Sequence, residues 1–229
     1  MLDIDIIDQQ PDFLIAYKPA GLSFHSESGQ PGLFQQVKAL ALTPELYPVH
    51  RLDKMTSGLI IFATNKNSAT EFQQLFEQRN IEKYYLAISD KKPKKKQGLI
   101  KGDMEKSRRG MWKLLRSQTN PAISQFFSYS LTEGKRLFII KPYTGRTHQI
   151  RVALASIGSA ILGDSYYSKS SSDRGYLHAY ALRFTIADKQ YQYLNYPHQG
   201  QEFTSKACQE LLSTTLAAPW QLIWPELKF

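Results

Sequence analysis

The stretch YPVHRLDKMTSGLIIFAT, residues 47–64, sets a charged turn directly before an apolar run. The apolar run, GLIIFAT at 58–64, is short and bounded by polar residues, so it predicts a buried strand. In the turn, Asp53 lies between Arg51 and Lys54. Such a carboxylate is either a turn residue that caps its own loop or a group whose chemistry depends on the cations around it.

The composition favours one domain and a polyanionic partner. A chain of 229 residues with 42% hydrophobic content can bury a sizeable core. Lys and Arg outnumber Asp and Glu by 29 to 20, which gives a formal net charge of +9. This surplus points to nucleic acid before an acidic membrane surface, although a generally basic soluble protein would share it. No repeat or long linker divides the chain, so we expect a single domain over 1–229.

The single cysteine and the N-terminal segment bear on the cellular compartment. Cys208 has no partner for an intrachain disulfide, and we expect it to be a core thiol in an amphipathic helix. The N-terminus lacks the basic and apolar regions of a signal peptide, and no apolar run approaches the length of a membrane span. We therefore expect a cytoplasmic protein without membrane association, and a monomer by default.

Hydrophobic patterning predicts an α+β fold. Alternating or apolar runs predict strands, two pairs of which form hairpins, at 2–7, 13–17, 58–64, 82–90, 123–131, 135–143, 177–187 and 191–197. Helical spacing predicts four helices, at 31–41, 67–80, 144–158 and 205–215. Because strands outnumber helices and hairpins dominate, we expect a mainly antiparallel mixed sheet flanked by helices.

Two of the predicted helices carry specific end signals. Ser68 and Glu71 have the spacing of a capping box at the start of the second helix. Thr144 is a candidate N-cap for the third helix, and Gly158 a candidate residue to end it.

Three motifs together resemble one enzyme family. HRLDKMTSGLIIFA at 50–63 closely resembles the catalytic signature of the RluA-like family of RNA pseudouridine synthases. EKYYLA at 82–87 resembles the second element of that family, and GRTHQIRVALASIGSAILGD at 145–164 resembles the third. Weaker similarity at 15–25 and 177–184 extends the resemblance over nearly the whole chain.

The resemblance implies an enzyme that isomerises uridines in structured RNA to pseudouridine, without a cofactor or a metal. It implies the pseudouridine synthase fold, with an active-site cleft between two lobes and with no separate N-terminal RNA-binding domain of the S4 type. It assigns Asp53 as the nucleophile, Arg146 as the cation that keeps Asp53 ionised, and Tyr85 as a residue that stacks on the uracil or assists proton transfer. Ribosomal RNA is the favoured substrate, and a transfer RNA stem-loop is possible.

Further residues are candidates for RNA contact. We expect substrate binding by residues of the first and third motifs, namely His50, Arg51, Thr56, His148, Gln149, Ile150 and Arg151. Arg51 is favoured to fill the space that a flipped uridine leaves, because a guanidinium stacks on bases and pairs with phosphate. A structural role is equally compatible with His50, and core packing with Ile150. Two basic segments are further candidates for RNA binding. The alternative for 91–97 is a solvated loop, and the alternative for 105–116 is an edge hairpin.

Alternatives from other functional classes stay open at this point. A non-catalytic RNA-binding protein would share the basic composition, but it would not require Asp53, Tyr85 and Arg146 together. A glycoside hydrolase normally uses two cooperating carboxylates, and the motifs hold one. The five histidines show no metal-ligand spacing, which disfavours a metal-dependent nuclease. Isomerisation of uridine without cleavage and without added metal would distinguish the enzyme from all three.

Overall fold

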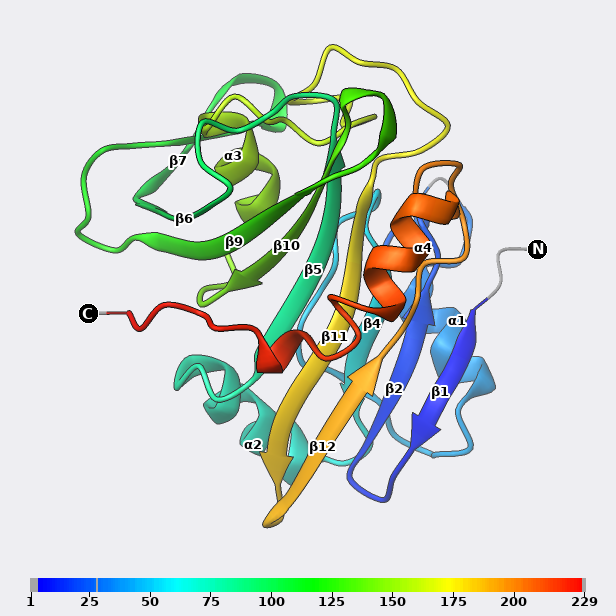
Figure 1. Ribbon diagram of the computed structural model, residues 1–229. Coiled ribbons are helices and arrows are strands. Elements are labelled where there is room, and N and C mark those ends of the chain that lie inside the picture. Colours follow the sequence, from blue (N-terminus) through cyan, green and yellow to red (C-terminus); the bar gives the residue numbers. More distant parts are fainter. Residues whose placement is uncertain (1–3, 28, 228–229) are drawn as a thin grey trace.

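The computed structural model describes residues 4–27 and 29–227, and its centre is a large mixed sheet (Figure 1). The strands of this sheet run in the order β1-β2-β4-β11-β5-β10-β9-β6, with β3 added to β4 and β12 to β11. Every described pairing is antiparallel except that of β4 with β11, so the predicted α+β fold is confirmed. The strands are β1 (Asp5–Gln9), β2 (Phe13–Lys18), β3 (Tyr47–Pro48), β4 (Ser57–Ala63), β5 (Glu82–Ser89), β6 (Gln97–Gly102), β9 (Ala122–Ser130), β10 (Arg136–Pro142), β11 (Leu177–Ile186) and β12 (Lys189–Leu194).

Helices and one small hairpin flank this sheet. The hairpin comprises β7 (Met104–Lys106) and β8 (Trp112–Leu114), so the second basic segment forms a hairpin, one of the two alternatives for it, as a sheet of its own. Within the described residues the α-helices are α1 (Leu33–Leu40), α2 (Lys66–Glu77), α3 (Gln149–Ser156) and α4 (Lys206–Ser213). Among the described residues, no helix is both long enough and apolar enough to cross a membrane.

The two faces of the central strand β5 have different tasks. Successive side chains of a strand point to opposite faces. Tyr84 packs against Trp224 of the C-terminal segment, with a ring-centroid distance of 5.9 Å. Figure 1 shows that segment and α4 crossing in front of the sheet. Lys83 and Tyr85 point the other way, into a cavity. The C-terminal segment therefore covers one face of β5, and the other face is open to a ligand.

The sheet splits along β11, and aromatic rings fill the split. Strand β4 pairs with the first residues of β11, whereas β12 pairs with the remainder. Between the two branches, the ring of Phe13 lies 4.9–5.7 Å from three other rings. One of these rings, Phe72, comes from α2, and the others belong to Phe184 and Tyr191. This cluster packs α2 against the sheet in the region between the two branches.

The start of β4 depends on a glycine. Gly58 has φ = 110°, and a Cβ atom built on it would lie 2.2 Å from the carbonyl oxygen of Ala179 on β11. No other residue type allows both this conformation and this close approach. The small residues predicted to form a tight turn after Asp53 thus allow β4 to begin against β11, four residues beyond that carboxylate.

Two predicted helix starts are wrong. The N-cap of α2 is Asn65, whose side chain accepts a hydrogen bond from the Ser68 amide at 2.9 Å, so the Ser68–Glu71 capping box does not form. Helix α3 begins at Gln149, because His148 adopts a left-handed conformation with φ = 58° that interrupts helical geometry. Gly158, with φ = 76°, follows the end of α3 as expected.

The remaining predicted elements lie close to their expected positions. Helix α4 begins after Ser205, whose hydroxyl accepts from the Cys208 amide, and Cys208 is buried as a core thiol. Both predicted hairpins form, β9 with β10 and β11 with β12. The first strand is β1; residues 2 and 3 of its predicted range lie outside the described residues.

Substitution of Gly58 tests the close approach of β4 and β11. Gly58→Ala should lower the free energy of unfolding by about 3 kcal/mol or more, because the methyl group meets backbone and the φ angle is unfavourable. Urea denaturation measures the change. Gly134→Ala is the matched control, since Gly134 also has positive φ (76°) but nothing lies within 4 Å of its Cβ position. Equal losses in the two variants would show that the φ angle alone is responsible.

Candidate active site

A cavity of about 810 Å³ lies on the open face of β5. Its walls come from the segment before β4 at 48–53, from β5, and from the segment at 142–151 that leads from β10 into α3. These three segments contain the three motifs identified in the sequence. The structure thus brings together residues that are almost 100 positions apart in the chain.

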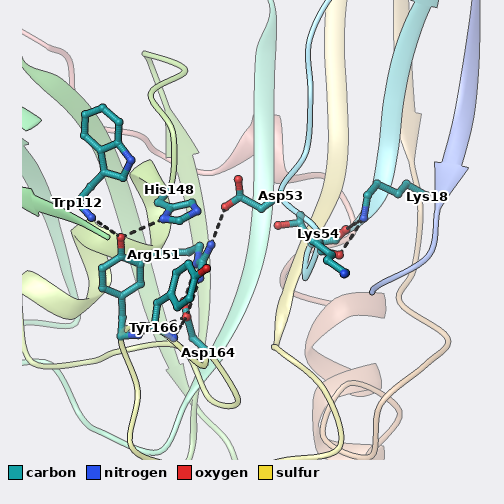
Figure 2. Close-up of polar contacts among 10 residues, drawn as sticks. Lys18, Asp53, Lys54, Trp112, His148, Arg151, Asp164 and Tyr166 are labelled. Atoms are coloured by element: carbon teal, nitrogen blue, oxygen red, sulfur yellow. Dashed lines mark hydrogen bonds and ion pairs between the residues drawn. The ribbon is translucent and has the colours of Figure 1, made fainter. Parts of the chain in front are cut away.

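Asp53 forms an ion pair with Arg151 in this cavity. Asp53 Oδ2 lies 3.3 Å from Arg151 Nη1, and Figure 2 shows the carboxylate pointing at the guanidinium. The Asp53 side chain is 26% exposed and that of Arg151 only 6%. Asp53 Oδ1 accepts no hydrogen bond from the described residues. One carboxylate oxygen is therefore held by a cation, and the other is free to meet a ligand.

A second carboxylate fixes Arg151 in place. Arg151 Nε and Nη2 donate to the two oxygens of the fully buried Asp164, at 2.7 and 2.8 Å. Such a bidentate pair is strong and fixes the plane of the guanidinium. Burial alone would lower the pKa of Arg151, but the hydrogen bonds and charges of Asp164 and Asp53 raise it above its ordinary value. Arg151 therefore stays charged beside Asp53.

The expected ion pair between Asp53 and Arg146 does not form. Arg146 is exposed at the cavity wall, and its guanidinium donates to the side-chain oxygen of Asn120. The reason is the late start of α3, which leaves Arg146 in a loop and puts Arg151 in the first turn of the helix. Arg151, predicted to bind substrate, is thus the cation that neighbours the carboxylate.

The side chain of Lys18 fixes the backbone of the turn that contains Asp53. Its buried Nζ donates to three carbonyl oxygens, those of Pro19 at 3.1 Å, Lys54 at 3.1 Å and Thr56 at 2.7 Å (Figure 2). The Thr56 amide in turn donates to the Asp53 carbonyl at 3.0 Å. Burial lowers the pKa of Lys18 to about 7, and the negative charge of Asp53 opposes that shift. The turn around Asp53 is therefore fixed from behind by a lysine of β2.

Tyr85 lines the cavity as expected. It lies on β5, half-buried, on the same face as Lys83. Burial and, to a smaller extent, the negative charge of Asp53 raise the pKa of Tyr85 well above its ordinary value. The phenol is consequently neutral at physiological pH, with a proton to donate and a flat ring to stack on a ligand.

Aromatic residues surround the guanidinium of Arg151. The rings of Tyr166 and Tyr167 each have their centroid 5.2 Å from Arg151 Cζ. The hydroxyl of Tyr167 accepts from the Trp112 amide at 2.8 Å and lies 3.0 Å from His148 Nδ1 (Figure 2). Burial, and then the charge of Arg151, lower the pKa of His148, so its ring is neutral beside the Tyr167 hydroxyl. The β7–β8 hairpin is thereby tied to the active site.

Sequence reasoning missed Asp164, Tyr166 and Tyr167. Asp164 ends the Ile-Leu-Gly-Asp turn of the third motif, so the motif itself was a signal. The two tyrosines follow the turn, and their backbone amides donate to Asp164 Oδ1 at 2.9 and 3.3 Å. Nothing in local sequence distinguished them from the other tyrosines of the chain.

Two of the predicted substrate-binding residues have structural contacts that use their polar groups. Gln149 Oε1 accepts from the Thr144 hydroxyl and the Arg146 amide, and its Nε2 donates to Ile123 and Ser124. Gln149 therefore holds the loop before α3, and Thr144 is not a helix cap. His50 Nε2 accepts the Ile61 amide proton at 3.0 Å, which supports the structural alternative for that nitrogen.

The other predicted contacts line the cavity. Arg51 is exposed at its rim, Thr56 is buried in the turn, and Ile150 is buried both in the core and on the cavity wall. The basic loop at 91–97 is solvent-exposed apart from Pro93. Roles of these residues in RNA binding stay predictions.

Comparisons with known proteins agree with the motifs. Residues 12–156 match the family model described as RNA pseudouridylate synthase. An uncharacterised RNA pseudouridine synthase of Haemophilus influenzae is 46% identical over 221 residues, covering 96% of this chain and 99% of the relative. The dual-specificity RNA pseudouridine synthase RluA of Escherichia coli is 29% identical, covering 88% of this chain and 91% of the relative.

A solved structure supports the fold. Human RNA pseudouridylate synthase domain containing 1 superposes with a TM-score of 0.71 at 24% identity, covering 84% of this chain and 83% of the human chain.

Stability measurements distinguish the two arginines of the third motif. Arg151→Met should lower the free energy of unfolding by about 3–5 kcal/mol, because it leaves the buried Asp164 carboxylate without its cation. Arg146→Met, the matched control in the same loop–helix segment, should change it by less than about 0.5 kcal/mol, because Arg146 is exposed. Urea denaturation of both variants measures the difference. A large loss in Arg146→Met would contradict the assignment of Arg151 as the buried partner.

Proposed function

The chain belongs to the RNA pseudouridylate synthase family, and we propose that Asp53 is its nucleophile, with Arg151 as the cation that pairs with this carboxylate and orients it. The protein is an isomerase that converts uridine in RNA to pseudouridine. The single observation that carries the assignment is the Asp53–Arg151 ion pair inside a cavity that Tyr85 also lines.

The reaction exchanges one bond to the ribose for another. The glycosidic bond from ribose C1′ to uracil N1 breaks, the uracil turns, and C1′ bonds to uracil C5. The C5 proton is lost and N1 gains one, so the product has the same atoms as the substrate. A carboxylate nucleophile divides this exchange into two steps through a covalent intermediate. Attack on the base and attack on the sugar both fit the free Oδ1 of Asp53.

Each side chain of the cavity suits one requirement of that reaction. The nucleophile must be aimed at the substrate, and the guanidinium of Arg151 holds one oxygen of the Asp53 carboxylate at 3.3 Å while the other stays open. The detached uracil needs a flat surface and a proton donor, and the neutral phenol of Tyr85 offers both. Arg146, at the exposed wall, is assigned to RNA contact instead of to Asp53. Arg51, at the rim, is assigned to the space left by the flipped nucleotide.

The basic surface next to the cavity suits RNA binding. The tip of the β7–β8 hairpin carries the exposed Arg108 and Arg109, and Trp112, which follows that tip, donates its backbone amide to the Tyr167 hydroxyl. This mixture of cations and an aromatic residue fits phosphate contact with base stacking. The exposed lysines of the loop at 91–97 are a second candidate for phosphate contact.

The RNA class is a finer proposal. Ribosomal RNA is favoured by the breadth of the RluA-like family, and transfer RNA is the alternative, since the Escherichia coli relative is named for dual specificity. We expect the protein to act in the cytoplasm as a monomer. Transcriptome-wide pseudouridine mapping with and without this protein identifies the RNA and the uridine together. If the protein only bound RNA, its removal would leave every pseudouridine in place.

The role of Asp53 is tested by a nearly isosteric change. Asp53→Asn should abolish detectable isomerisation, because an amide cannot act as the nucleophile, while RNA affinity and thermal stability persist. Pseudouridine must be detected by chemical derivatisation or nucleoside chromatography, since product and substrate have equal mass. A folded Asp53→Asn variant that still isomerises uridine would rule out this nucleophile. Loss of activity through unfolding would favour a structural role in the turn.

A further inference from the structure

Lys83 is a buried lysine on the cavity wall that lacks a carboxylate partner. It is 9% exposed, and its side chain shares the cavity face of β5 with Tyr85. Nζ lies 5.2 Å from the centroid of the Phe76 ring, and no carboxylate among the described residues forms an ion pair with it. The neighbouring acid, Glu82, points to the opposite face.

The neighbouring acid is already paired on that opposite face. Glu82 accepts from Lys141 Nζ at 2.7 Å, from Arg183 Nε at 2.5 Å and from the Tyr84 hydroxyl at 2.9 Å. Asp53, the acid of the cavity, is held by Arg151. The carboxylate next to Lys83 in the strand and the carboxylate of the cavity are thus both paired with other cations.

His50 places a second hydrogen-bond donor at the same end of the cavity, because its ring lies 5.1 Å from the Phe76 ring that Lys83 also contacts. Because Nε2 accepts the Ile61 amide proton, the proton of the neutral ring is on Nδ1. Among the described residues, no acceptor is bonded to Nδ1. Burial, and then the charge of Lys83, lower the pKa of His50 to about 3, so the ring stays neutral. Lys83 and His50 therefore offer an ammonium and an N–H group without an acceptor.

Burial of an unpaired ammonium is unfavourable for folding. Removal from water lowers the pKa of Lys83 to about 8. A buried ammonium that has no opposite charge beside it in the free protein is typical of a site that awaits a ligand. The ligand of this cavity is RNA, and the only anionic group of RNA is the phosphodiester. A phosphate oxygen would satisfy both donors and restore the balance of charge.

We propose that Lys83 Nζ and His50 Nδ1–H form a phosphate subsite at one end of the active-site cavity, which binds a phosphodiester next to the target uridine. The inference rests on the proposed function, because it takes RNA as the ligand. The subsite would anchor the backbone while the base enters the part of the cavity beside Asp53 and Tyr85. Lys83 is thus a binding and positioning residue, distinct from the group that reacts.

The first test compares Lys83→Met with wild type. Methionine keeps the length of the side chain and suits a buried position, so the thermal midpoint should be unchanged or higher. The substrate is a synthetic stem-loop that contains the mapped uridine. In single-turnover isomerisation of this RNA, the half-saturating concentration of Lys83→Met should be about tenfold or more above that of wild type. Lys38→Met, an exposed lysine of α1, is the charge-matched control and should stay within twofold of wild type. A clear fall of the thermal midpoint in Lys83→Met, or kinetics equal to wild type, would overturn the proposal.

The second test asks whether the group bound is a phosphate. Single methylphosphonates, which are uncharged, replace the phosphates on either side of the target uridine one at a time. At one position the replacement should weaken RNA binding by wild type about tenfold. It should weaken RNA binding by Lys83→Met less than twofold, because the variant has already lost the contact. Equal losses in both proteins at every position would assign Lys83 to the base or the ribose instead.

A binding measurement separates failure of the subsite from failure of the proposed reaction. Fluorescence anisotropy with a labelled decauridylate requires no isomerisation. If wild type isomerises no RNA but Lys83→Met binds decauridylate more weakly than wild type and Lys38→Met do, the proposed function fails and the subsite stands. If wild type isomerises RNA and all three proteins bind decauridylate equally, the subsite fails and the function stands.

Discussion

The site is organised by one guanidinium between two carboxylates. Arg151 makes two short hydrogen bonds to Asp164 and one longer contact, of 3.3 Å, to Asp53. The asymmetry separates two tasks, since the fully buried Asp164 fixes the cation and the partly exposed Asp53 uses it. Arg151 also joins α3 to the turn before β4 and to the turn that follows α3. Loss of this single group would separate α3 from the turn that contains Asp53 and from the turn that contains Asp164.

Around this interaction the backbone is held from several sides. Lys18 supports the turn of Asp53 through three carbonyl oxygens, and Gly58 allows β4 to meet β11. Gln149 fixes the loop before α3 with both ends of its amide. A nucleophile must be held in its productive geometry by residues that do not react. These three residues meet that requirement without touching the open oxygen of Asp53.

The fold class could be predicted from sequence because it depends on local patterns, and the resemblance of three motifs to one family directed attention to Asp53, which the structure places in the cavity. Alternating and apolar runs located the strands, and the motif around Asp53 identified the carboxylate. The choice between Arg146 and Arg151 could not be made, because it depends on where α3 begins. That point is set by the left-handed backbone of His148 and by long-range contacts of Gln149. The support from Lys18, 36 residues away from Lys54, is invisible for the same reason.

Among the described strands, β4 and β11 form the one parallel pair, and this pairing affects how the chain folds during its synthesis. Ser57 and its hydrogen-bond partner His178 are 121 residues apart. At about 5–20 residues per second, a ribosome needs roughly 6–24 s to synthesise that interval. Throughout that time β4 has been synthesised and its apolar residues are exposed, but the edge of β4 that pairs with β11 has no native partner. Contacts of such long range slow folding, so the emerging chain depends on protection from aggregation until its last third has left the ribosome.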